Sequence, residues 1–321
     1  MPTATPTTPE PTVRINLMIE GQESVTWPQW VALAEATEAD GLEGLFRSDH
    51  YQSVDGRTER SSLDAWATLA ALGPVTDRIR LGTMVSPTSF RHPSVLAKNV
   101  VTADHTSGGR VELGMGAGWN ELEHRTYGFA FHELGARYDV FEEQVEIVWR
   151  QFREDRFDHH GTHYTLDGCE ARPKPLQDPA VPLILGGVAG PRSAALAARF
   201  ADEYNTVFPS PEVAAERKAN LDKACDEVDR APLTYSIMTG CLLGRDEAEV
   251  RDRAALLHQR SGADDALDTW LDRLRGEWIV GTPDQAADRL EAYAAVGVER
   301  VMLQHQLHDD TDMVALMGAL T

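Results

Sequence analysis

Hydrophobic residues along this chain form short runs that alternate with longer stretches in which apolar residues recur every three or four positions. The short runs are rich in Val, Ile and Leu, as in buried parallel strands, and the longer stretches have the spacing of amphipathic helices. The runs predict eight strands, over residues 15–19, 44–47, 79–85, 111–115, 183–185, 204–208, 233–243 and 301–304.

Helices are predicted between these strands, over residues 27–39, 62–75, after Pro93, and over 191–200, 211–228, 246–259 and 284–296. Strands that alternate with helices in this way are typical of parallel strands joined by right-handed crossovers. About eight such units are what a closed (β/α)8 barrel requires, so the predicted fold class is α/β, a TIM barrel. Because periodicity does not detect closure, a doubly wound open sheet is the alternative.

Length alone leaves the number of domains open, because about 150 residues per domain suggests two domains, whereas an α/β barrel uses about 250 residues as one unit. The chain has 321 residues, of which 42% are hydrophobic and 25% charged, near the average of globular proteins. We expect one barrel domain over residues 13–321, preceded by a disordered tail over residues 1–12, where Thr, Pro and Ala dominate. Two insertions, over 153–182 and 261–281, exceed a minimal barrel unit and are expected to form lids or substrate walls.

Charge and cysteine usage exclude several classes of protein. With 30 Lys and Arg against 51 Asp and Glu, the formal charge is −21, which argues against nucleic acid or an anionic membrane as partner. No apolar run approaches the ~18 residues of a membrane helix. Cys169, Cys225 and Cys241 form neither a CxxC pair nor an even set, and no secretory signal precedes them. These features predict a cytoplasmic protein.

Candidate chemistry is expected directly after the strands, because barrel enzymes place their reactive groups at the carboxyl ends of the strands. The polar dipeptide Asp49-His50 follows the second predicted strand, and a histidine that titrates near neutrality can give or take a proton there. A histidine that only caps or packs is the alternative for His50. Other residues expected at this face are Glu20, Ser86, Trp119, Asn120, Gly186 and Gly187. The chain has no GxSxG, HExxH or P-loop motif.

Two glycine turns follow strands, at Gly116-Ala117-Gly118 and at Gly186-Gly187-Val188-Ala189-Gly190. Such turns let the backbone approach a planar or phosphorylated ligand, although a tight βα turn needs the same residues. Neither turn matches GxGxxG in full, which disfavours Rossmann binding of NAD. His159, His160 and His163 have a spacing poor for one helix face, so we predict no metal site.

Several segments in their order and spacing resemble the bacterial luciferase-like monooxygenase superfamily, and within it the branch that uses the deazaflavin coenzyme F420. They are Ser48-Asp49-His50, LGTMV at 81–85, LGMGAGWN at 113–120, PKP at 173–175 and Gly186-Gly187. The resemblance spans residues 13–307. It implies a (β/α)8 barrel that binds coenzyme F420, or alternatively FMN, at its C-terminal mouth, usually as a homodimer.

The resemblance also implies roles for particular residues. His50 would be catalytic and lie near the hydride-transfer centre, and the peptide between Met84 and Val85 would be cis and support the ring. The chain departs at Val54 and Trp119 from the sugar-phosphate dehydrogenases of the family, which leaves the substrate open. The full set of implied coenzyme-binding residues is Asp49, His50, Met84, Val85, Ala117, Gly118, Trp119, Asn120, Tyr138, Gly186, Gly187, Val188 and Ala189.

The function expected from this resemblance is hydride transfer between coenzyme F420 and a small organic substrate, with His50 managing the proton. If His50 is not the proton group, Glu20 or Glu121 is the next candidate. The alternative is an FMN-dependent monooxygenase that uses oxygen and reduced flavin from a coenzyme-reducing partner enzyme. A non-catalytic flavin-binding barrel and a metal-dependent barrel hydrolase are further alternatives.

Overall fold

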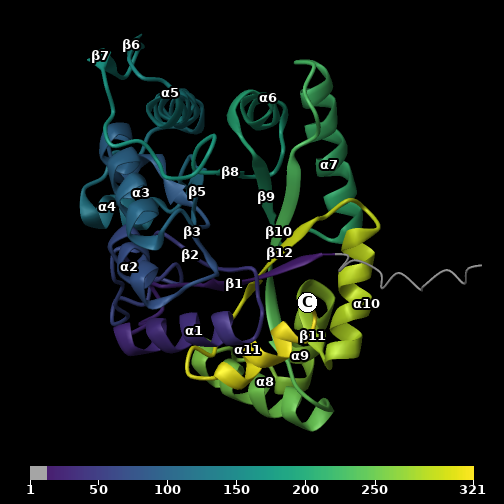
Figure 1. Ribbon diagram of the computed structural model, residues 1–321. Coiled ribbons are helices and arrows are strands. Elements are labelled where there is room, and N and C mark those ends of the chain that lie inside the picture. The colour runs from purple at the N-terminus through teal and green to yellow at the C-terminus, as the bar shows by residue number, and fades with distance from the viewer. Residues whose placement is uncertain (1–12) are drawn as a thin grey trace, which may run out of the picture.

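The computed structural model describes residues 13–321, so the tail expected over residues 1–12 lies outside the described residues. Eight parallel strands close into a barrel (Figure 1). The ring closes because β12 pairs with β1 on one side and with β10 on the other. The barrel strands are β1 (Arg14–Ile19), β2 (Gly44–Arg47), β3 (Arg80–Thr83), β5 (Val111–Gly116), β8 (Leu183–Gly186), β9 (Glu203–Val207), β10 (Thr234–Leu243) and β12 (Arg300–Gln304).

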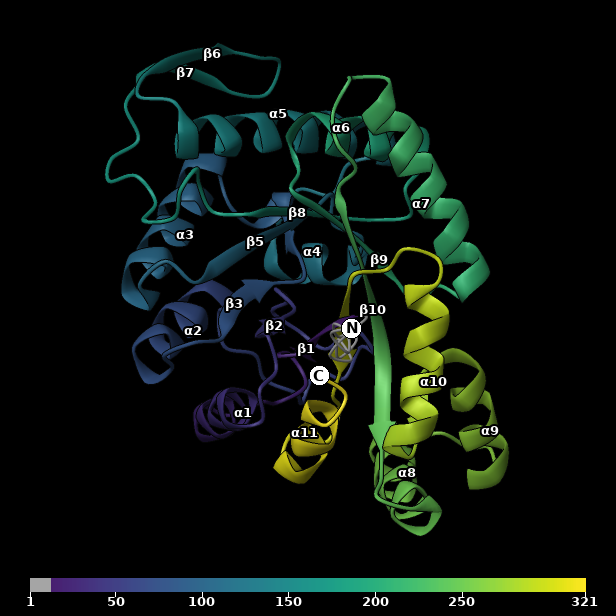
Figure 2. The ribbon, with the colours of Figure 1, turned by 45° about the vertical axis from the view of Figure 1, so that its right-hand side comes forward.

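Helices surround the barrel (Figure 2). Helices α8 and α11 gather beyond the arrowhead of β10, at its carboxyl end, with α9 beside α8. The helices are α1 (Trp27–Ala39), α2 (Ala65–Leu72), α3 (Pro93–Ser107), α4 (Glu121–Tyr127), α5 (Leu134–Arg153), α6 (Pro191–Phe200), α7 (Pro211–Asp226), α8 (Glu247–Ser261), α9 (Leu267–Glu277), α10 (Pro283–Ala294) and α11 (Thr311–Gly318).

The structure confirms the eight predicted strands but moves some boundaries. Strand β3 ends at Thr83 rather than Val85, and the Met84–Val85 peptide bond is cis, as the resemblance implied. Pairing with β5 resumes at β4 (Ser86–Pro87). Helix α2 begins at Ala65, later than expected, because Asp64 is its N-cap and accepts a hydrogen bond from the backbone N–H of Ala67 at 2.9 Å.

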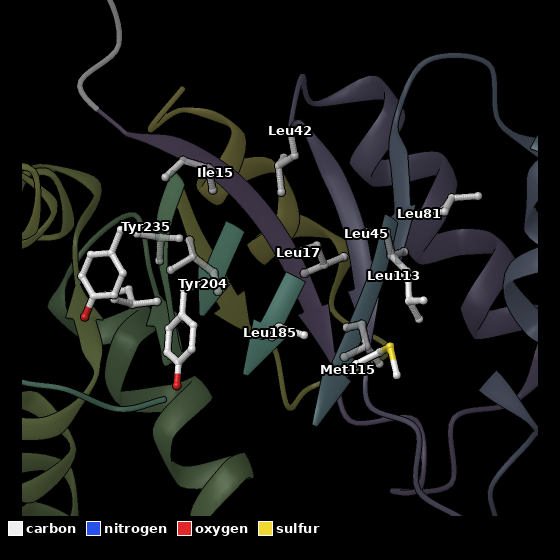
Figure 3. Close-up of a cluster of buried hydrophobic side chains, with 14 of the residues drawn as sticks. Ile15, Leu17, Leu42, Leu45, Leu81, Leu113, Met115, Leu185, Tyr204 and Tyr235 are labelled. Atoms are coloured by element: carbon white, nitrogen blue, oxygen red, sulfur yellow. The ribbon is translucent and has the colours of Figure 1, made fainter. Parts of the chain in front are cut away.

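Alternation along the strands builds two apolar layers, because successive side chains of a strand point to opposite faces. On β1, Ile15 and Leu17 belong to the large layer between the barrel and its helices, part of which Figure 3 shows. Met18 belongs instead to a separate buried cluster with Phe46, Ile184, Met238 and Met302, which fills the barrel interior.

The amino-terminal end of the barrel is closed by buried charges. Arg300, the first residue of β12, forms ion pairs with Glu43 at 2.7 Å, Glu112 at 2.9 Å and Glu203 at 2.5 Å. These carboxylates, together with the guanidinium, occupy the space that a ligand would need at this end. The opposite end of the barrel is therefore the one that can hold a ligand.

The two insertions lie in different places. Residues 153–182 contain an antiparallel hairpin, β6 (Phe157–His160) and β7 (Thr165–Cys169), which lies beside α5 at the periphery (Figures 1 and 2). Residues 261–281 contain α9 and β11 (Ile279–Gly281), and β11 extends the sheet beside β10. Within residues 13–321, no helix combines the length and the apolar character needed to cross a membrane.

Candidate active site

A cavity of about 1090 Å³ lies at the carboxyl ends of the barrel strands. Its lining includes residues that follow four of the strands, namely Glu20, His50, Ala117 and Gly187. Ligand sites commonly have volumes of about 300–1,000 Å³, so this cavity has room for a coenzyme and part of a second molecule.

Most of the expected coenzyme-binding residues line this cavity. They are His50, Met84, Val85, Ala117, Gly118, Trp119, Asn120, Tyr138, Gly186, Gly187 and Val188. Asp49 and Ala189 do not line it, and both are buried against the protein instead.

Asp49 was expected to face a flavin-like ring, and the structure places it behind the surface of the cavity. Its carboxylate is buried and accepts hydrogen bonds from Arg91 Nη1 at 2.5 Å and from Ser86 Oγ at 2.7 Å. His50, the next residue, lines the cavity instead. Asp49 therefore holds a buried ion pair with Arg91 and is not part of the cavity lining.

His50 is held by a carboxylate that the sequence analysis missed. Its Nδ1 lies 2.7 Å from Oε2 of Glu123, whose side chain is fully buried. Burial alone would lower the pKa of His50, but the hydrogen bond and the charge of Glu123 outweigh burial and raise that pKa above its ordinary value. Glu20 and Asp49 add to this rise. His50 consequently keeps its proton to a higher pH than a free histidine does.

Glu123 is positioned by the start of α4. The side chain of Asn120 accepts a hydrogen bond from the backbone N–H of Glu123 at 3.3 Å, which caps the helix and turns Glu123 inward. The other oxygen of Glu123 accepts the backbone N–H of Tyr51 at 2.5 Å. An Asn followed three residues later by Glu is a sequence signal for a helix start, and it does not distinguish a buried Glu from an exposed one.

The two alternative proton groups differ in their placement. Glu20 lines the cavity, where its carboxylate accepts hydrogen bonds from Gln22 and Gln304. Glu121 is exposed and does not line the cavity. Trp119, whose ring centroid lies 5.9 Å from that of His50, is 64% exposed and forms an edge of the cavity beside the histidine.

The glycines of β5 and β8 make room for Val85. A Cβ on Gly116 would lie 2.7 Å from Cγ2 of Val85, and one on Gly186 would lie 3.0 Å from Cγ1. Side chains at either glycine would therefore displace Val85, which projects between the two strand ends. The two glycines therefore let the side chain of Val85 lie close to the backbone of β5 and β8, where it forms one wall of the cavity.

Hydrogen bonds from the side chain of Tyr204 hold the turn after β8. Its hydroxyl accepts the backbone N–H of Ala189 at 2.9 Å and donates to Ser193 Oγ at 3.1 Å. Ala189 has a φ of 52°, a conformation that few non-glycine residues adopt. The hydrogen bonds of Tyr204 hold this turn in shape where it leads into the N-terminus of α6.

The histidines of the β6–β7 hairpin lie outside the cavity. His159 is within 3.4 Å of Glu143, on α5, and His160 is exposed. Residues 13–321 contain no group of three or more His, Cys, Asp or Glu side chains arranged to hold a metal ion.

Comparison with known proteins gives the family. Residues 12–300 match the model of the luciferase-like monooxygenase family, and the chain belongs to this family of enzymes. It is similar to an F420-dependent glucose-6-phosphate dehydrogenase of Nakamurella multipartita, with 29% identity over 308 residues that cover 89% of each chain. It is also similar to the pyrimidine monooxygenase RutA of Stutzerimonas stutzeri, with 27% identity over 268 residues, 80% of this chain and 70% of that protein.

Among solved structures, the fold matches that of an F420-dependent secondary alcohol dehydrogenase in complex with an F420-acetone adduct. The TM-score is 0.80, with 96% of this chain and 98% of that chain covered. At 18% sequence identity, this likeness establishes the barrel fold and leaves the substrate open.

Proposed function

We propose that this protein is an oxidoreductase that transfers a hydride between coenzyme F420 and a small organic substrate. The observation that carries the proposal is His50, which stands at the barrel mouth with Nδ1 bound by the buried carboxylate of Glu123. The names of two curated relatives, both F420-dependent glucose-6-phosphate dehydrogenases, support F420 as the coenzyme.

The shape of the cavity fits such a coenzyme. Val85 projects between glycines of β5 and β8 and would support one face of a flat ring. The turn at Gly187 and Val188 leads into α6, a helix of ten residues whose amino-terminal backbone N–H groups favour a phosphate. Tyr138 also lines the cavity, and the guanidinium of Arg192, on α6, lies over its ring at 5.5 Å from the ring centroid. When bound, the deazaflavin supplies hydride transfer, which no side chain can supply.

The protein's own part in the reaction is to manage a proton. Because Nδ1 of His50 is engaged by Glu123, Nε2 is the ring nitrogen left to exchange a proton with a bound molecule. When a carbonyl group is reduced, its carbon gains the hydride and its oxygen gains a proton, which Nε2 donates. The Glu123 carboxylate stabilises the protonated imidazole before this transfer, and the reverse reaction returns the proton to Nε2.

An FMN-dependent monooxygenase is the second candidate, supported by the similarity to RutA. The two functions differ in their need for oxygen. In single-turnover experiments the protein is mixed with reduced F420 or with reduced FMN, and uncharged ketones are added with or without air. The proposed function predicts that ketones reoxidise F420 at the same rate with and without oxygen. Substrate conversion only with FMN and air would establish the alternative instead.

We further propose that the protein is a cytoplasmic homodimer supplied with reduced coenzyme by a partner enzyme. Its three cysteines are free, which suits a reducing compartment. Light scattering coupled to size-exclusion chromatography tests the dimer, because a mass near that of one chain, 35.4 kDa, would contradict it.

A further inference from the structure

We propose that the second molecule held in this cavity is an uncharged, mainly apolar one, and that α8 and α9 build the wall that selects it. This proposal deepens the proposed function, because it assumes that the coenzyme occupies the half of the cavity around Val85 and Gly187. The apolar wall is formed by other residues of the cavity, and the evidence for it does not depend on which coenzyme is bound.

The selecting wall comes from the second insertion and the helix before it. Leu257 on α8, Trp270 and Leu274 on α9, and Trp278 just after α9 line the cavity. The first three are 5–7% exposed, so they present only an edge to the cavity and are held by the core behind them. The ring of Trp278 occupies the space beside Gly240 on β10 that a side chain would fill. The wall is therefore rigid and apolar.

Two further apolar residues of the cavity retain surface that a ligand could cover. Val207 and Phe208, at the end of β9, line the cavity and yet are 45% and 42% exposed. A large apolar surface left open inside a cavity favours an apolar ligand, since covering it removes it from water.

The charges around the cavity disfavour an anionic ligand. Within residues 13–321, five carboxylates line it, those of Glu20, Glu23, Asp55, Glu123 and Asp309. The cationic side chains in the lining are two guanidinium groups and His50, whose charge is paired with Glu123. A phosphate or carboxylate on the second molecule would meet this excess of negative charge.

Both guanidinium groups already have partners. Arg60 forms an ion pair with Glu23 and lies 4.0 Å from Asp55, and Nη2 of Arg260 lies 3.4 Å from Asp309. His308 adds no positive charge near neutral pH, because burial, with the nearby His305 and Arg260, lowers its pKa to about 3. A phosphorylated sugar would thus have to compete with Glu23, Asp55 and Asp309 for these two guanidinium groups.

The test measures binding to the coenzyme-free protein by calorimetry. The probes are 2-butanone, 2-hexanone and 2-octanone, with glucose 6-phosphate as the anionic comparison. The proposal predicts an affinity that rises roughly fourfold for each added methylene group. Glucose 6-phosphate should bind more weakly than 2-octanone. Equal affinities for the three ketones, or tighter binding of glucose 6-phosphate than of 2-octanone, would overturn the proposal.

A matched pair of variants locates the wall. Leu257→Ala should weaken binding of 2-octanone by roughly twofold, since it removes the small apolar area that Leu257 presents to the cavity. Leu256→Ala is the control, because Leu256 is its neighbour on α8 but is 53% exposed and does not line the cavity. Equal affinities in the two variants would contradict the assignment of the wall. If Leu257→Ala does not fold, the ketone series with the wild-type protein still decides.

The outcomes separate this proposal from the proposed function. If the affinity rises with ketone length but the protein binds no F420, the apolar wall is supported and F420 is refuted as the coenzyme. If the protein binds F420 and turns over phosphorylated sugars, the proposed function is supported and the proposal of an apolar second molecule is refuted.

Discussion

Replacing Glu123 with Gln tests whether this buried carboxylate sets the protonation of His50. The amide oxygen of Gln can still accept the backbone N–H of Tyr51, so the substitution removes mainly the charge 2.7 Å from Nδ1 of His50. An opposite charge at such a distance shifts a pKa by about 1–3 units. At an effective dielectric constant of about 20, two charges 4 Å apart interact by about 4 kcal/mol, which corresponds to the upper end of that range.

The direction of the effect follows from the raised pKa of His50. As a proton donor, His50 is active when protonated, so the rate of substrate reduction should fall as pH rises through its pKa. In Glu123→Gln that fall should move to lower pH by about 1–3 units, and the rate above the wild-type pKa should drop roughly 10- to 1,000-fold. The affinity for the coenzyme should change little, because Glu123 acts through His50.

The assay is the pH profile of kcat/KM for substrate reduction, together with an NMR titration of His50. Glu121→Gln is the matched control, since Glu121 lies on the same helix but is exposed and outside the cavity. Glu123→Asp, which keeps the charge, should recover part of the wild-type profile. A folded Glu123→Gln variant with an unchanged pH profile would refute the positioning role of Glu123.

Three further predictions concern other parts of the molecule. His50→Ala should bind the coenzyme nearly as tightly as the wild type but turn over at least ~10-fold more slowly; a lost affinity with full turnover at saturation would show that His50 only packs. Asp49→Asn should lower the free energy of unfolding by about 3 kcal/mol in denaturant titrations, because it leaves Arg91 short of a buried partner, and an unchanged midpoint would contradict this. Burial lowers the pKa of His305 to about 4 and that of His308 to about 3. Because these histidines are buried in the neutral form, the stability that they contribute is present above their unfolded pKa of about 6.5 and should be lost as pH falls toward 4. A denaturation midpoint that does not change with pH over this range would contradict their burial in the neutral form.

The fold could be predicted from the sequence because its strands are short, continuous apolar runs. The run at 44–47 matches β2 residue for residue, and the eight runs match the eight strands that close the barrel. The end of the third strand could not be placed, since Met84 and Val85 are as apolar as the strand before them. Their backbone nonetheless leaves the strand to form one wall of the cavity.

The site could be predicted only in part, for a similar reason. His50 was found because it follows a strand directly. Asp49 was included with it, because its buried partners Arg91 and Ser86 come from a later part of the chain and only the tertiary fold brings them together. Glu123 was missed because an acidic residue in the first turn of a helix is common on solvated surfaces, and only the tertiary fold shows that it is buried against His50.

Parallel calorimetric titrations with F420 and FMN show which coenzyme the protein prefers. We expect F420 to bind roughly tenfold or more tightly than FMN, a difference of about 1.4 kcal/mol or more. Binding of FMN with equal or greater affinity would contradict this expectation.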